Sequence, residues 1–108
     1  MKQYTKSLMK MNFEGLDMSL VAKIEFAFSQ EIGQPPLKIA EYPTNDAGLM
    51  YGSTIGVVWW PEETALFKPD KVFYADTRIT LRDSSYNPET SIIRLKMNPT
   101  LFEDGGEV

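Results

Sequence analysis

The chain contains no cysteine and no histidine among its 108 residues. Without cysteine there can be no disulfide framework and no thiolate zinc site, and without histidine the commonest metal ligand and general base is missing. Catalytic triads that depend on histidine are therefore excluded, and no GxGxxG, P-loop, GxSxG or HExxH motif occurs. We expect no catalytic residues, no metal site and no cofactor.

Positive charge and long apolar runs are also scarce. The net charge is −4, with 11 Lys and Arg against 15 Asp and Glu, which opposes attraction to phosphate backbones. No apolar run approaches the roughly 20 residues that span a bilayer. Lysines interrupt the apolar residues near the start of the chain, so no signal-peptide core is present. We expect a protein made in the cytoplasm that binds neither nucleic acid nor membrane.

The chain is rich, in contrast, in short β-strand patterns. Alternating apolar residues, or dense β-branched and aromatic residues, predict strands at 22–28, 37–42, 49–51, 55–60, 71–82 and 90–97. For residues 17–30 a helix is the competing interpretation, because Leu20, Ile24 and Phe28 also have helical spacing. Residues 1–11 form either a loose arm or an edge strand, and the tail at 103–108 is expected to be mobile.

One short helical turn is expected near residues 61–67. Pro61 suits the first position of a helix, and Glu62 and Glu63 favour its positive end, where we expect both carboxylates to be solvated. Leu66 and Phe67 would then attach the turn to the core.

Six or seven short strands, with turn signals roughly every ten residues, are typical of two packed antiparallel sheets. The sequence therefore predicts a single all-β domain over residues 1–108, an immunoglobulin-like β-sandwich without its disulfide. A small barrel is the alternative.

The candidate binding residues are four aromatic side chains: Trp59, Trp60, Tyr51 and Tyr74. Trp59 and Trp60 are neighbours on one predicted strand and so point to opposite faces, which means that at most one of them lies deep in the core. An exposed Trp could stack on a sugar or anchor a protein interface. The alternative is that a neighbouring loop covers this Trp, which then has a purely structural role.

Two other polar groupings have simple structural explanations. Asp76 and Arg78 lie two residues apart on one strand face, where an exposed ion pair contributes about 0 to 1 kcal/mol. The loop at 83–89 gathers oxygen ligands of the kind that calcium prefers, but turn chemistry accounts for the same residues.

Four short segments occur in a characteristic order: Phe28-Ser29-Gln30, Glu63 to Phe67, Arg78, and Leu101 to Gly105. In this order the chain resembles small proteins of prophage tail regions in Gram-positive gut bacteria. It departs from their pattern at Pro61-Glu62, which replace a polar pair, and at Asn87-Pro88-Glu89, which lengthen a hairpin.

The resemblance implies a non-enzymatic structural or adaptor protein of a phage or prophage tail, associated with the virion. Such a protein acts through protein–protein contacts, including contacts between its own copies. The alternative is a carbohydrate-binding module that uses an exposed Trp as a stacking platform. A small enzyme working through Asp76, Glu62 or Glu63 is the third hypothesis.

Overall fold

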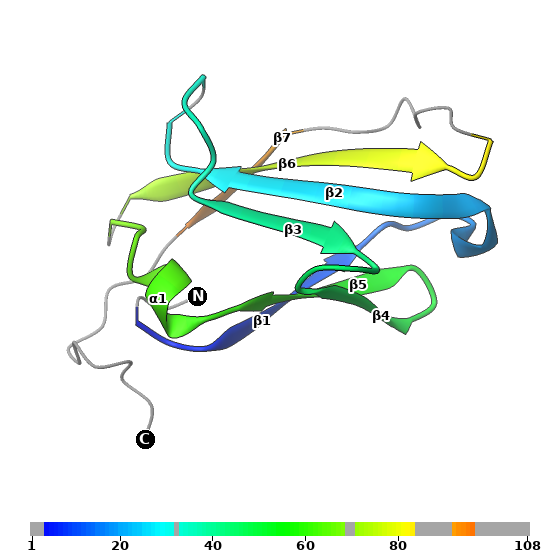
Figure 1. Ribbon diagram of the computed structural model, residues 1–108, viewed down its shortest axis with the longest axis horizontal. Helices are drawn as coiled ribbons and strands as arrows, with labels where there is room; N and C mark the ends of the chain where they lie inside the picture. The colour runs from blue at the N-terminus through cyan, green and yellow to red at the C-terminus, as the bar shows by residue number, and fades with distance from the viewer. Residues whose placement is uncertain (1–3, 32, 69–70, 84–91, 97–108) are drawn as a thin grey trace.

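The computed structural model describes residues 4–31, 33–68 and 71–83, together with the backbone of residues 92–96 (Figure 1). Within these residues the strands form two antiparallel sheets that lie face to face. The three-stranded sheet has the order β1 (Ser7–Asn12), β5 (Thr54–Trp59), β4 (Ala47–Tyr51). The four-stranded sheet has the order β3 (Lys38–Tyr42), β2 (Val21–Ser29), β6 (Val72–Leu81), β7 (Ile92–Lys96).

The predicted all-β fold is confirmed, and the described strands form two antiparallel sheets rather than one closed barrel. The strand order differs from that of an immunoglobulin constant domain, in which the second strand joins the sheet of the first, fourth and fifth. Here β2 lies between β3 and β6. The nine-residue β2 matches the ten-residue β6 along its length, from Val21 opposite Leu81 to Ser29 opposite Tyr74.

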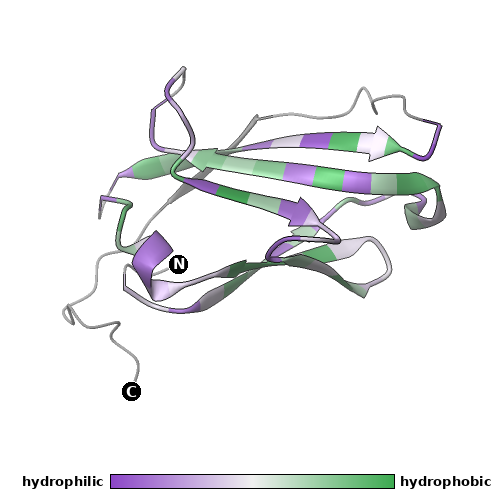
Figure 2. Ribbon diagram, in the orientation of Figure 1, coloured by the Kyte–Doolittle hydropathy of each residue, from purple (hydrophilic) through white to green (hydrophobic). Residues whose placement is uncertain are grey.

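Alternation with a period of two determines which side chains form the core. On β2, Ile24, Phe26 and Phe28 are all buried, while the residues between them face outward and are half-buried. Figure 2 shows this alternation of hydrophobic and hydrophilic residues along β2 and β6. The strand interpretation of residues 22–28 is therefore confirmed. The helical interpretation of 17–30 is wrong except for one 3-10 turn, η1 (Met18–Leu20), because pairing with β3 and β6 satisfies the backbone of β2 on both sides.

Aromatic rings fill the end of the core nearest to the short helix α1 (Pro61–Thr64). The Trp59 ring lies 4.7 Å from that of Phe28, 5.2 Å from that of Phe67 and 5.7 Å from that of Phe73, measured between centroids, in edge-to-face arrangements that such rings prefer. Phe67 attaches the turn to the core as predicted. The same prediction for Leu66 is wrong, because its side chain is 56% exposed.

Of residues 1–11, for which a loose arm and an edge strand were the alternatives, those from Ser7 onward belong to the edge strand β1 (Ser7–Asn12), and residues 1–3 lie outside the described residues. Each residue of β1 lies opposite a residue of β5. The buried hydroxyl of Thr64 in α1 accepts a hydrogen bond of 3.0 Å from the backbone N–H of Thr5, which ties the residues before β1 to the helix. The predicted mobile tail at 103–108 lies outside the described residues.

Within the described part of the chain, no helix has the length and apolar character that crossing a bilayer requires.

Candidate functional site

The four aromatic candidates lie in separate places. Trp59 is fully buried and Trp60 is 38% exposed, so the prediction that at most one of the pair is deep in the core is confirmed. Tyr51 is 62% exposed and lies where β4 turns into β5, at the opposite end of β5 from Trp60. Tyr74 is half-buried on the outer face of the four-stranded sheet. The four residues therefore do not form one binding site, and Trp59 offers no surface for a ligand.

Trp60 is held by three neighbours. Its indole Nε1 donates a hydrogen bond of 3.1 Å to Asp46 Oδ1, and its backbone N–H donates one of 2.9 Å to Glu63 Oε1. The ammonium of Lys6 lies 4.8 Å from the centroid of its ring. Because Lys6 occupies one ring face as a cation–π contact, less of the indole remains for stacking on a sugar.

A buried lysine, which sequence reasoning missed, organises this end of the molecule. The side chain of Lys38 on β3 is fully buried. Its Nζ donates to Glu63 Oε1 at 2.8 Å and Oε2 at 3.0 Å and to Asp46 Oδ2 at 3.1 Å, and it lies 5.6 Å from the centroid of the Trp59 ring. We call Lys38, Asp46, Glu63 and the Trp60 indole the lysine cluster. It joins the four-stranded sheet to the helix that follows β5.

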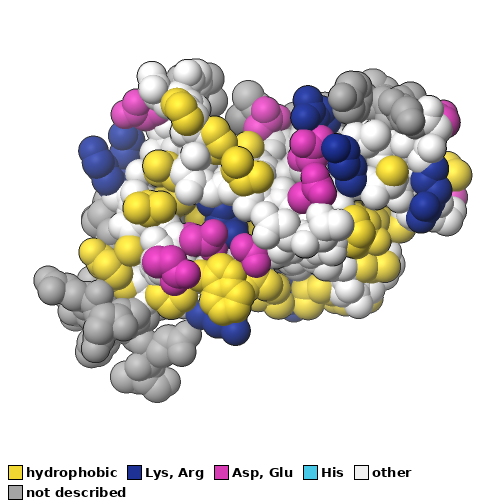
Figure 3. All heavy atoms as spheres, viewed as in Figure 1, with side chains coloured by type: hydrophobic (Ala, Val, Ile, Leu, Met, Phe, Trp, Pro, Cys, Tyr) yellow, Lys and Arg dark blue, Asp and Glu magenta, His cyan; other side chains and the backbone are white. Residues whose placement is uncertain are grey.

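The expectation that both glutamates of the helical turn are solvated is wrong for Glu63. Its side chain is only 24% exposed because it is drawn to Lys38, whereas Glu62 is exposed as expected. Figure 3 shows acidic side chains gathered beside α1. The alternation of side chains along β3 could have indicated the buried lysine. Lys38 and Ala40 lie two residues apart and so share a face, and Ala40 is a core residue, so the Lys38 side chain points inward.

The lysine cluster perturbs the ionisation of Asp46. Burial raises the pKa of the Asp46 carboxyl, but hydrogen bonds from Trp60 and Lys38 and the charge of Lys38 together outweigh burial, so the pKa is lowered overall. The carboxylate is thus ionised in the folded protein at neutral pH. This arrangement is that of a structural ion cluster, because Lys38 already has its carboxylate partners.

The lowered pKa of Asp46 predicts a pH-dependent contribution to stability. A carboxyl whose pKa is lower in the folded than in the unfolded chain stabilises the fold above its unfolded pKa, and this contribution is lost as pH falls through the folded pKa. We expect the stability advantage of the natural protein over Asp46→Asn to be constant near neutral pH and to shrink below about pH 4. Thermal melts between neutral pH and pH 3 measure it; an advantage that does not change with pH would contradict this account.

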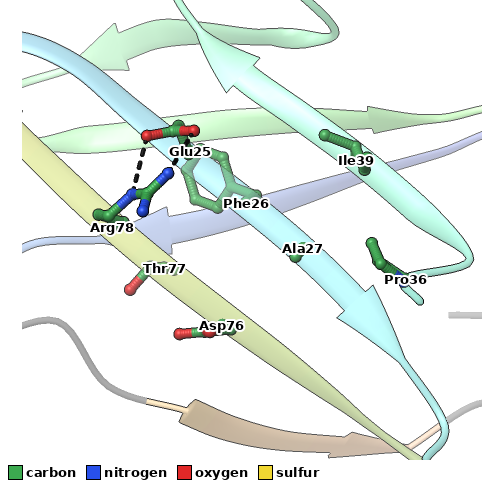
Figure 4. Close-up of a pocket in the computed structure, with 8 residues that line it drawn as sticks. All are labelled: Glu25, Phe26, Ala27, Pro36, Ile39, Asp76, Thr77 and Arg78. Carbon is green, nitrogen blue, oxygen red and sulfur yellow. Dashed lines mark hydrogen bonds and ion pairs between the residues drawn. The ribbon is translucent and has the colours of Figure 1, made fainter. Parts of the chain in front are cut away.

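A concave surface lies on the outer face of the four-stranded sheet (Figure 4). It consists of two adjoining hollows of about 310 and 260 Å³ that share Ala27, Pro36 and Asp76, and we call it the outer groove. The groove exists because Ala27 on β2 lies directly opposite Ile39 on β3 and Asp76 on β6, so that a methyl group lies between two larger side chains. Its lining residues are Glu25, Phe26, Ala27, Ser29, Glu31, Gly33, Gln34, Pro36, Ile39, Tyr74, Asp76, Thr77 and Arg78.

An ion pair borders the outer groove. Arg78 Nε and Nη2 each donate a hydrogen bond of 3.0 Å to the carboxylate of Glu25, the residue directly opposite on β2. The hydrogen bond from Arg78 lowers the pKa of the Glu25 carboxyl despite partial desolvation. The sequence suggested Asp76, two residues away on the same strand, as the partner of Arg78. Glu25 was not anticipated, because it lies on another strand and strand pairing cannot be read from the sequence.

The outer groove combines an apolar wall with fixed charges. Ile39 is 59% exposed at one side, and Tyr74, one of the predicted binding residues, lines the other. Among the residues with described side chains, no three acidic groups lie close enough to hold a metal ion. The loop at 83–89, whose oxygen-bearing residues turn chemistry explains without an ion, lies, apart from Asp83, outside the described residues. The groove is suited to a protein segment that offers both apolar and charged side chains.

Comparison with protein-family models, curated proteins and solved structures gives no significant match to this chain.

Proposed function

We propose that this chain is a non-enzymatic structural or adaptor protein of a phage or prophage tail, which works through protein–protein contacts and is associated with the virion. The observation that carries the binding role is the outer groove, which presents exposed apolar residues beside charged ones. The tail setting is supported by the resemblance of the order of short segments in this sequence to that of prophage tail-region proteins.

The geometry of the groove favours a protein partner over a small substrate. The floor is a strand surface and the walls are side chains of β3, β6 and the loop before β3, so the groove follows an open sheet face and does not enclose a ligand. Small-molecule sites, in contrast, bury most of the ligand surface. An open, amphipathic surface supported by rigid strands suits a partner that is itself folded or that lies extended across the strands.

Tail particles purified from the organism that encodes the chain provide the test. We expect the natural protein to sediment with the particles, and Ala27→Arg, which fills the groove floor, to lower the particle-bound fraction by at least about tenfold, equivalent to 1.4 kcal/mol. Mass spectrometry of the particle fraction measures this. Glu14→Arg is the matched control, because Glu14 is exposed and does not line the groove.

Circular dichroism of both variants must first show an unchanged fold. The proposal is overturned when the natural protein is missing from the particles, or when Ala27→Arg is incorporated as well as Glu14→Arg.

Carbohydrate binding at Trp60 is the second candidate function. It is supported by the 38% exposure of an indole that Asp46 holds in a fixed orientation, since rigid aromatic platforms lose little entropy on binding. A glycan array discriminates the two functions: carbohydrate binding requires a signal that Trp60→Ala abolishes and Ala27→Arg leaves intact. A blank array removes this candidate.

A further inference from the structure

The outer face of the three-stranded sheet has the opposite charge to the outer groove. On β1, Leu8 and Lys10 point outward, since they are exposed and alternate with half-buried residues that pack on the core. Leu8 is 51% exposed and Met50 of β4 is 39% exposed. Both side chains converge on Gly56 of β5, where an added Cβ would lie 3.0 Å from Leu8 Cδ1 and 2.8 Å from Met50 Sδ. A glycine at the centre of this sheet thus allows two apolar side chains to meet over it.

The charges on this face are positive. Lys6, which lies over the Trp60 ring, and Lys10, which lies opposite Gly56, occupy it, and none of the outward positions of β1 and β5 is acidic. We call Lys6, Leu8, Lys10, Met50 and the outward Val58 the basic face. In a chain of net charge −4, such a face is a local reversal of the overall sign.

The outer groove provides the complementary chemistry on the other side of the molecule. Its lining contains three carboxylates, those of Glu25, Glu31 and Asp76, against one guanidinium, that of Arg78. Glu25 is paired with Arg78, and Glu31 has Lys71 at 3.9 Å. Asp76 is exposed, and none of the ion pairs between described side chains includes it.

We propose that the basic face of one molecule docks into the outer groove of a second copy. The inference rests on the proposed function, because it names the partner of the same groove. Lys6 and Lys10 would meet Asp76 and Glu31, and Leu8 and Met50 would meet the apolar wall formed by Ile39 and Pro36. The two sheets lie on opposite sides of the molecule (Figure 1), so one copy can use both surfaces at once. Such a head-to-tail contact produces rings when its rotation closes and filaments when it does not.

Charge reversal on each surface separately tests this docking. We expect the weight-average mass of the natural protein to rise above 12.3 kDa between about 1 µM and 1 mM, the affinity range of weak contacts. The association should weaken between about 0.05 and 0.5 M salt, because added salt screens the charges. Lys6→Glu with Lys10→Glu should remain monomeric, as should Asp76→Lys with Glu31→Lys, whereas an equal mixture of the two double variants should associate again. Sedimentation velocity measures all four samples.

Each alternative outcome has a distinct meaning. The docking is overturned if the natural protein stays at 12.3 kDa under all conditions. It is also overturned if the Asp76→Lys, Glu31→Lys variant associates like the natural protein, because the contact then does not use the outer groove. Failure of the mixture to associate when both variants are folded also overturns it. If the chain is found in tail particles but is monomeric in isolation, the docking is overturned and the proposed function stands.

Discussion

Trp59→Ala is expected to lower the free energy of unfolding by about 3 to 5 kcal/mol, the usual cost of truncating a buried large aromatic residue. Trp59 is fully buried and its ring contacts those of Phe28, Phe67 and Phe73. Alanine would leave a cavity between the two sheets and would remove the ring that lies beside the buried ammonium of Lys38. Because domains of this size are stable by only about 5 to 15 kcal/mol, this one change should bring the fold close to unfolding. Urea denaturation followed by circular dichroism measures it.

Trp60→Phe is the matched control, because it changes the neighbouring residue and keeps an aromatic ring beneath Lys6. It removes the hydrogen bond from the indole to Asp46 and should cost only about 0.5 to 1.5 kcal/mol. Equal losses for the two variants would show that the aromatic core does not dominate the stability of the fold. Trp59 Nε1 is buried without a hydrogen-bond partner among the described residues, so the loss of that N–H carries no penalty in Trp59→Ala.

Glu63→Gln is expected to destabilise the protein by about 2 to 4 kcal/mol. Breaking a fully buried ion pair by removing one partner costs about 3 to 5 kcal/mol, and the 24% exposure of Glu63 reduces that figure. The cost arises because Lys38 remains fully buried with Asp46 as its one remaining carboxylate partner in the lysine cluster. Glu62→Gln, one residue away and exposed, should change stability by less than about 0.5 kcal/mol.

A double-mutant cycle separates the ion pair from the packing of the two side chains. Combining Glu63→Gln with Lys38→Met should cost less than the sum of the single changes, because methionine fills the space of the lysine stem and removes the buried ammonium that Glu63→Gln deprives of a carboxylate partner. Additive costs, or equal effects of Glu63→Gln and Glu62→Gln, would show that the contact between Lys38 and Glu63 contributes little.

The strand pattern was predictable because burial on one face of a strand imposes a period of two on the sequence. The alternation of Ile24, Phe26 and Phe28 against Lys23, Glu25 and Ala27 indicated β2, and the structure buries the first three. The same argument placed Trp59 and Trp60 on opposite faces. The short helix was predictable as well, from proline and acidic residues at its start.

The lysine cluster and the outer groove were not predictable, because each depends on partners that are distant in the sequence. Lys38 contacts Glu63, 25 residues further along the chain, and nothing local distinguishes Glu63 from Glu62. Ala27 becomes a groove floor only because the register places it between Ile39 and Asp76. A shift of one residue in either pairing would put different side chains beside it.

The sequence by itself determined the class of fold, the face of each long strand that turns inward, and the absence of histidine and cysteine chemistry. These properties follow from residue types and from the spacing of neighbours along a strand. Only the tertiary structure decided that β2 joins the sheet of β3 and β6, that a buried lysine links that sheet to α1, and that a basic face and an acidic groove lie on opposite sides of the molecule. Strand order and register bring together residues that are far apart along the chain, and the free energy of that pairing is shared among long-range contacts that no local pattern records.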